Sequence, residues 1–183
     1  MRHYIKTIPY KAEKRETSEN HGFKLLKGRL DEIRSIPEVQ DIQELHDALA
    51  DINHPDTPFF STGCEKKFNQ ENGIFWVRGF VEFAFNHPEL ALDAVNYFKL
   101  FFKFNWHVWE KQFDIPLRFH FEMDGADFVV IGKEGFSVCV WITTDDLQTA
   151  DEAKNVWCKG VRFFSQFLRS ISKPQTPTIY QSP

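Results

Sequence analysis

The chain has 183 residues, a formal net charge of −4 and a hydrophobic share of 42%. This length fits one domain that buries its core without disulfides or metals, and the composition excludes a disordered chain, a collagen-like repeat and a long coiled coil. Aromatic residues are frequent at 16%, with 20 Phe alone. The three Cys have no regular spacing and predict no disulfide framework.

Charge is distributed unevenly along the chain. Residues 1–30 hold eight basic and three acidic residues, a net of +5, whereas residues 31–60 hold eight acidic residues and one basic, a net of −7. We expect residues 1–20 to be a basic N-terminal arm, or one short strand that pairs elsewhere. One domain over 21–172 and a mobile Pro-rich tail over 173–183 follow. The chain lacks a signal peptide and a long apolar run, so we expect a cytoplasmic protein without membrane contact. The net negative charge disfavours nucleic acid as a partner.

The first expected elements form a helical hairpin. Residues 23–36 place apolar side chains at helical spacing, and Ser35-Ile36-Pro37-Glu38 has the spacing of a capping box for a second helix that runs to Ile52. Residues 53–73 have no periodicity and contain Pro and Gly at intervals, which predicts a long loop.

The middle of the chain alternates between strand and helix patterns. Residues 74–85 alternate in polarity and predict a strand. Residues 88–111 fit two structures: their second half alternates like a strand, but seven polar residues fall within about 120° of a helix circumference. We therefore prefer a long, mostly buried helix there. Residues 116–144 predict a three-stranded meander with turns at Asp124-Gly125 and at 132–135.

A final helix completes the pattern. Thr149 to Glu152 has capping-box spacing, and an apolar stripe continues to Ile171. The order α-α-β-α-β-β-β-α predicts an α+β fold of two layers. The sheet is expected to have four mostly antiparallel strands, with the helices packed on one face.

Polar and aromatic side chains of the predicted strands share the sheet face away from the helices. An antiparallel sheet commonly leaves one face in solvent, but Trp and Arg are also the residue types that anchor interfaces. We expect a surface that binds a ligand or a partner, made of Trp76, Arg78, Phe80, Glu82, Arg118, His120 and Trp141.

Two functions fit this surface. The first is a non-catalytic binding or protein-interaction module for a protein partner, a second copy of the chain, or a small aromatic or cationic ligand held by carboxylates against Trp76 and Trp141. The alternative is a small enzyme in which His120 acts as acid or base with Glu122 or Glu82. A pocket under the long loop would favour the enzyme, and an open face the module. The simplest alternative is a solvated face with cross-strand ion pairs.

Other motifs are weak. His120 and Glu122 resemble half of an iron-binding facial triad, but no His follows them in the chain, so we expect no metal. Phosphate-binding glycine motifs are missing, so we expect no cofactor. Cys64 would be a nucleophile if a helix began beside Lys66 and Lys67, although an ordinary loop cysteine is the simpler interpretation.

Overall fold

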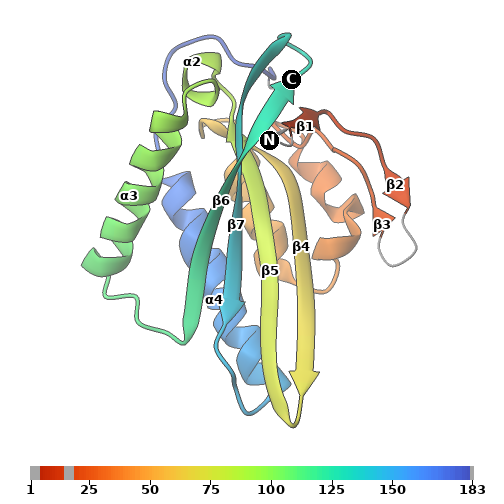
Figure 1. Ribbon diagram of the computed structural model, residues 1–183, viewed down its shortest axis with the longest axis vertical. Coiled ribbons are helices and arrows are strands. Elements are labelled where there is room, and N and C mark those ends of the chain that lie inside the picture. Colours follow the sequence, from red (N-terminus) through yellow and green to blue (C-terminus); the bar gives the residue numbers. More distant parts are fainter. Residues whose placement is uncertain (1–4, 15–18, 182–183) are drawn as a thin grey trace.

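A curled five-stranded sheet organises the molecule, as the computed structural model shows for residues 5–14 and 19–181 (Figure 1). The strand order is β1-β6-β7-β5-β4, and all neighbours are antiparallel except β1 and β6, which are parallel. A separate antiparallel pair joins β2 and β3. The strands are β1 (Ile5–Ile8), β2 (Glu13–Lys14), β3 (Glu19–Asn20), β4 (Phe59–Glu71), β5 (Ile74–Phe85), β6 (Leu117–Phe128) and β7 (Lys133–Thr144).

Helices cover one face of the sheet and lie beside the part of β6 that β1 does not pair with. The long helix α4 packs behind β5 and β7, α1 packs on α4, and α3 stands beside β6 (Figure 1). Among the described residues, no helix is both long and apolar enough to cross a membrane. The helical elements are η1 (Leu30–Ser35), η2 (Pro37–Val39), α1 (Gln43–Asn53), α2 (Pro88–Ala91), α3 (Ala94–Glu110) and α4 (Ala150–Arg169).

The core lies between α4 and the sheet. Trp157 of α4 is fully buried and donates its indole N–H to the carbonyl of Ile142 at 3.0 Å. Its ring lies over Gly79, where a Cβ atom would come within 2.5 Å of the ring, so this close approach requires glycine. Phe104 lies 5.0 Å from Phe164 in an aromatic cluster that accounts for much of the Phe content.

The predicted α+β class with a mostly antiparallel sheet is confirmed, but the four-stranded sheet is wrong. Residues 59–71, expected in a loop, form β4 and pair with β5 along its whole length. The alternation that marks a strand is broken twice here. A bulge shifts the register between Ser61 and Gly63, and the polar side chain of Lys66 lies on the face toward the helices, 3.9 Å from Asp41.

The predicted meander is also wrong in its strand count. Residues 116–144 form two long strands, because Gly125 continues the β6 ladder opposite Phe136 instead of making a turn. The chain turns further on, between Phe128 and Lys133. Strand β1 lies in the segment expected as an arm or one short strand, and it was not counted in the predicted sheet. With β1 and β4 added and one strand fewer over 116–144, the sheet has five strands in place of four.

The predicted helical hairpin is only partly present. Gly28 adopts a positive φ of 73°, which interrupts a helix, so the 3-10 turn η1 replaces most of the first predicted helix. The second is present as η2 at its start and α1 over the rest. Ser35 caps nothing; its hydroxyl donates to the carbonyl of Glu32. The cap of the last helix is confirmed, since Thr149 accepts a hydrogen bond from the N–H of Glu152 at 3.1 Å.

The helix predicted over 88–111 is present as α2 and α3, but α3 is not mostly buried. Only Tyr97, Leu100 and Phe104 of this helix are buried. The division of the chain at residues 20 and 173 stays a prediction. Described residues outside 21–172 contribute to the core, namely Ile8, Ile179 and Tyr180.

Candidate functional site

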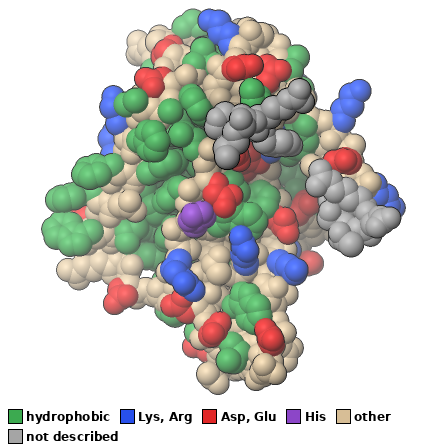
Figure 2. Space-filling view, in the orientation of Figure 1, with side chains coloured by type: hydrophobic (Ala, Val, Ile, Leu, Met, Phe, Trp, Pro, Cys, Tyr) green, Lys and Arg blue, Asp and Glu red, His purple; other side chains and the backbone are tan. Residues whose placement is uncertain are grey.

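The open face of the sheet is organised in transverse rows, because residues opposite each other in register have Cβ atoms about 5 Å apart. A cationic row lies beside an aromatic row, and an acidic row follows. Figure 2 shows this face, with Lys and Arg side chains gathered below the purple His. Each row is given from β4 through β5 and β7 to β6. The cationic row is Lys67-Arg78-Thr143-Arg118, the aromatic row is Glu65-Phe80-Trp141-His120, and the acidic row is Gly63-Glu82-Cys139-Glu122.

Trp141 is the centre of the side-chain contacts on this face. The guanidinium of Arg78 lies over its ring at 4.2 Å, and Phe80 meets the ring edge-on at 4.8 Å. The indole N–H of Trp141 donates to Glu122 at 2.8 Å, and Glu122 also lies 3.4 Å from His120 Nε2. We call these five residues the Trp141 cluster.

Three of the residues expected on this surface lie around the cluster instead of within it. Glu82 is buried, forms an ion pair with Lys6 of β1, and accepts a hydrogen bond from Ser137. Arg118 is exposed and lies 3.2 Å from Asp145. Trp76 is separated from Trp141 by the cationic row and lines a cavity of about 210 Å³ near α4.

The geometry of His120 and Glu122 is that of an exposed pair. Their side chains are 70% and 48% exposed, and Glu122 is already an acceptor for Trp141. The segment expected to loop over them is the strand β4 of the sheet itself. Acid–base catalysis benefits from a site that excludes water. This arrangement is better suited to binding than to activating a bond.

Cys64 and Cys139, the two cysteines of the sheet, do not supply a nucleophile. Cys64 lies in β4, where burial, followed by the charge of Glu38, raises the pKa of its thiol to about 12. Burial, with Glu82 and Glu122 nearby, also raises the pKa of Cys139. Both thiols are therefore protonated at neutral pH. In residues 5–14 and 19–181, no group of three or more His, Cys, Asp or Glu side chains is placed to hold a metal.

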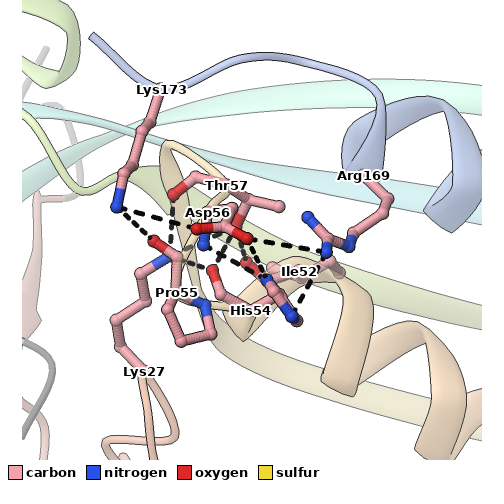
Figure 3. A network of polar contacts seen from close by, with 8 residues as sticks. All are labelled: Lys27, Ile52, His54, Pro55, Asp56, Thr57, Arg169 and Lys173. Carbon is pink, nitrogen blue, oxygen red and sulfur yellow. Dashed lines mark hydrogen bonds and ion pairs between the residues drawn. The ribbon is translucent and has the colours of Figure 1, made fainter. Parts of the chain in front are cut away.

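A second polar cluster lies at the other side of the fold, where the sequence predicted nothing (Figure 3). Lys27 is 2% exposed, and its ammonium donates to the carbonyls of His54 at 2.6 Å and Thr57 at 2.8 Å, and to the Thr57 hydroxyl at 3.1 Å. These acceptors match the three donors of an ammonium group. Lys27 therefore ties its own segment to the connection between α1 and β4.

Further charges surround Lys27 (Figure 3). Arg169 and Lys173 each lie 4.0 Å from Asp56, and Lys173 donates to the carbonyl of Pro55 at 2.9 Å. Together with Lys27, His54 and Thr57, these residues form what we call the Lys27 network. Its contacts join positions about 30 or more residues apart, which is why no local pattern in the sequence indicates it.

The Lys27 network borders a cavity of about 310 Å³ that is also lined by His87 and Tyr180. Burial lowers the pKa of Lys27 to about 7, and repulsion by Lys173 adds to this. The three acceptors act in the opposite direction, because they favour the charged ammonium. Since every donor of Lys27 already has an acceptor, we interpret the network as a structural anchor and not as a nucleophilic site.

The two clusters thus differ in what they offer to another molecule: the Lys27 network is satisfied from within, whereas the Trp141 cluster lies on an open face. The chain matches no model of a known protein family, and searches of curated proteins and of solved structures return no match. The function is therefore argued from the chain's own geometry.

Proposed function

We propose that the chain is a binding module whose open sheet face takes an acidic, extended segment of a protein partner. The observation that carries the proposal is the cationic row beside the Trp141 cluster. Lys67, Arg78 and Arg118 come from three strands, share one row, and are all exposed. Arg and Trp are over-represented among the residues that contribute most to interface affinity.

The spacing of the row supports a segment that crosses the strands. Four neighbouring strands span about 14 Å, so Lys67 and Arg118 stand at opposite ends of that distance. In an extended chain, the side chains at i, i+2 and i+4 point the same way and also span about 14 Å. Acidic residues at the two outer positions match Lys67 and Arg118. The middle position lies within about 2 Å of Arg78 along the row, an offset that the long Arg side chain can span.

The neighbouring aromatic rings supply an apolar contact beside the charges. Phe80 and Trp141 are half-buried, so each keeps part of its ring accessible. On the other side of the cationic row lies Trp76, which is also half-buried. An apolar residue flanking the acidic positions would bury surface against these rings. Charge then sets the orientation of the segment, and ring contact adds affinity.

A random-peptide display selection against the purified chain tests the proposal. We expect the selected peptides to be enriched in Asp and Glu, with aromatic or aliphatic residues between or beside them. Calorimetry should show at least about a tenfold loss of affinity for Arg78→Ala and for Trp141→Ala, the size expected for central interface residues.

The matched control is Trp109→Ala, which removes an equally large ring that is 69% exposed on α3. This variant should bind the selected peptides as wild type does. The proposal is wrong if the peptides show no acidic enrichment, or if they bind Trp141→Ala and wild type equally well.

A further inference from the structure

Helix α3 presents an apolar stripe to solvent on the side that faces away from the core. We call its members the α3 aromatic face, and they fall within about 80° of the helix circumference. Figure 2 shows hydrophobic side chains gathered over this helix. The members, with their exposed fractions, are Val95 at 49%, Phe98 at 57%, Phe102 at 72%, Trp106 at 56% and Trp109 at 69%.

The opposite side of the same helix fixes its orientation. Tyr97 is fully buried; its hydroxyl donates to the carbonyl of Phe136 at 2.5 Å and accepts from the N–H of Phe85 at 3.2 Å. Phe104 fills the aromatic core. Because Tyr97 and Phe104 point into the core, the opposite side of α3 faces solvent. This side lies about 100° around the helix from the centre of the polar stripe that was expected to face solvent over 88–111. Asn96 and His107 of that stripe are consequently half-buried while large rings are exposed.

We propose that the α3 aromatic face is covered by a second copy of the chain, with the two α3 helices antiparallel about a two-fold axis near Phe102. The five side chains expose roughly 600 Å², given the usual size of aromatic side chains. A symmetric pair would thus remove about 1,200 Å² from water, the lower limit for a specific interface. An exposed patch of this size is at the upper end for a monomer.

The charges beside the stripe match those of a second copy. Lys99, in the second turn of α3, and Glu110, at its C-terminal end, lie on the same flank of the helix, and neither forms an ion pair with another described residue. With the axis near Phe102, antiparallel pairing places Glu110 of one copy about 7.5 Å along the helix axis from Lys99 of the other, an offset that these two long side chains can span. Towards an anionic lipid surface, the same flank would present Lys99 and Lys103 but also Glu110, whose charge gains a partner only in a second copy, and the chain carries a net charge of −4. These charges favour the second copy over a membrane.

Sedimentation equilibrium of the full chain tests the pairing. We expect a reversible dimer with a dissociation constant in the micromolar range. Phe102→Glu should raise that constant by about 30-fold or more, because it places two carboxylates face to face at the axis. The matched control, Val130→Glu, puts the same charge on a 55% exposed residue between β6 and β7 and should leave the constant unchanged.

Exchanging the charges of Lys99 and Glu110 distinguishes a second copy of the chain from any other molecule bound to the α3 aromatic face. Lys99→Glu and Glu110→Lys should each weaken the dimer, by about threefold for an exposed pair. The double variant should restore wild-type association, because it exchanges the two charges within the same pair. Thermal unfolding of each variant at low concentration should match the wild-type monomer and show that the fold is intact.

The proposal is overturned if the wild type stays monomeric up to about 1 mM, or if Phe102→Glu leaves a dimer unchanged. Binding to vesicles rich in phosphatidylserine that Phe102→Glu abolishes, without a wild-type dimer, would assign the face to a membrane surface instead. This face is separate from the Trp141 cluster, so either proposal can fail without the other.

Discussion

Lys27 and Arg78 each lie in a cluster with other polar side chains, but the two cations differ in exposure and in hydrogen bonding. Lys27 is 2% exposed, and its ammonium has three oxygen acceptors within 3.1 Å. Arg78 is exposed on the sheet. Its guanidinium lies over the ring of Trp141, and this guanidinium makes no hydrogen bond to another described side chain or backbone group. A buried, satisfied cation holds segments together, whereas exposed donors positioned by a ring are available to a partner.

We expect the largest change in stability from a substitution in the Lys27 network. Lys27→Met removes three donors and leaves the carbonyls of His54 and Thr57 without them, which should lower the free energy of unfolding by about 3 kcal/mol. Urea denaturation measures this loss. Affinity for a selected acidic peptide should not change. Lys24→Met, on an exposed lysine nearby, is the control and should cost less than about 0.5 kcal/mol.

A Lys27→Met variant as stable as wild type would contradict the structural interpretation of the network. A variant of wild-type stability that loses peptide binding would reverse the roles of the two clusters.

The pH dependence of stability tests the same buried region. Burial lowers the pKa of His87, which lines the cavity next to Lys27, so the folded state resists protonation of this ring. The unfolded chain binds a proton near pH 6.5. The contribution of His87 to stability should therefore be complete above about pH 6.5 and be lost as the pH drops below it, whereas the lowered pKa of Lys27 acts above about pH 7. Urea titrations at pH 7.5 and 5.5 measure the loss, and His87→Gln should reduce it.

His107 contributes in the same direction, since burial also lowers its pKa. His87→Gln with an unchanged pH dependence would show that His87 is not the group responsible.

Trp141→Ala should reduce peptide affinity strongly and stability only slightly, the opposite of Lys27→Met. The ring is half-buried and makes cross-strand contacts with Phe80, so its loss should lower the free energy of unfolding by only about 1 kcal/mol. Peptide affinity should fall at least tenfold. Denaturation and calorimetry on the same preparation compare the two. A large loss of stability with intact binding would make Trp141 a structural residue.

The smallest effect is expected at the end of the cationic row. Arg118 and Asp145 are 75% and 50% exposed, so Arg118→Ala should change stability by less than about 0.5 kcal/mol. It should instead reduce the dependence of peptide affinity on ionic strength, because one of three cations is lost. Calorimetry at low and high salt checks this. A salt dependence equal to that of wild type would exclude Arg118 from the binding surface.

The open face was largely predictable because strand periodicity is local. Alternation within β5, β6 and β7 puts Arg78, His120 and Trp141 on one face, whatever the exact partners are. Burial of Glu82 was not predictable. It depends on Lys6 of β1, 76 residues away, which pairs with it across the sheet.

Tertiary contacts override local pattern elsewhere. In β4, pairing with β5 supplies the backbone hydrogen bonds, so a polar stretch with Lys66 facing the helices still forms a strand. In α3, the hydroxyl of Tyr97 and the packing of Phe104 decide which side turns inward, although the polar stripe indicates another direction. In a helix with two apolar sides, contacts with the neighbouring elements determine which side is buried.

Backbone amide and indole NMR spectra during titration with a selected acidic peptide test the central claim most directly. The indole N–H of Trp141, bound to Glu122 in the free chain, is a direct reporter. We predict shifts at this signal and at the outer-face residues of β5, β6 and β7, with α3 and the Lys27 network unchanged. Shifts confined to α3 or to the cavity beside Lys27 would contradict the account.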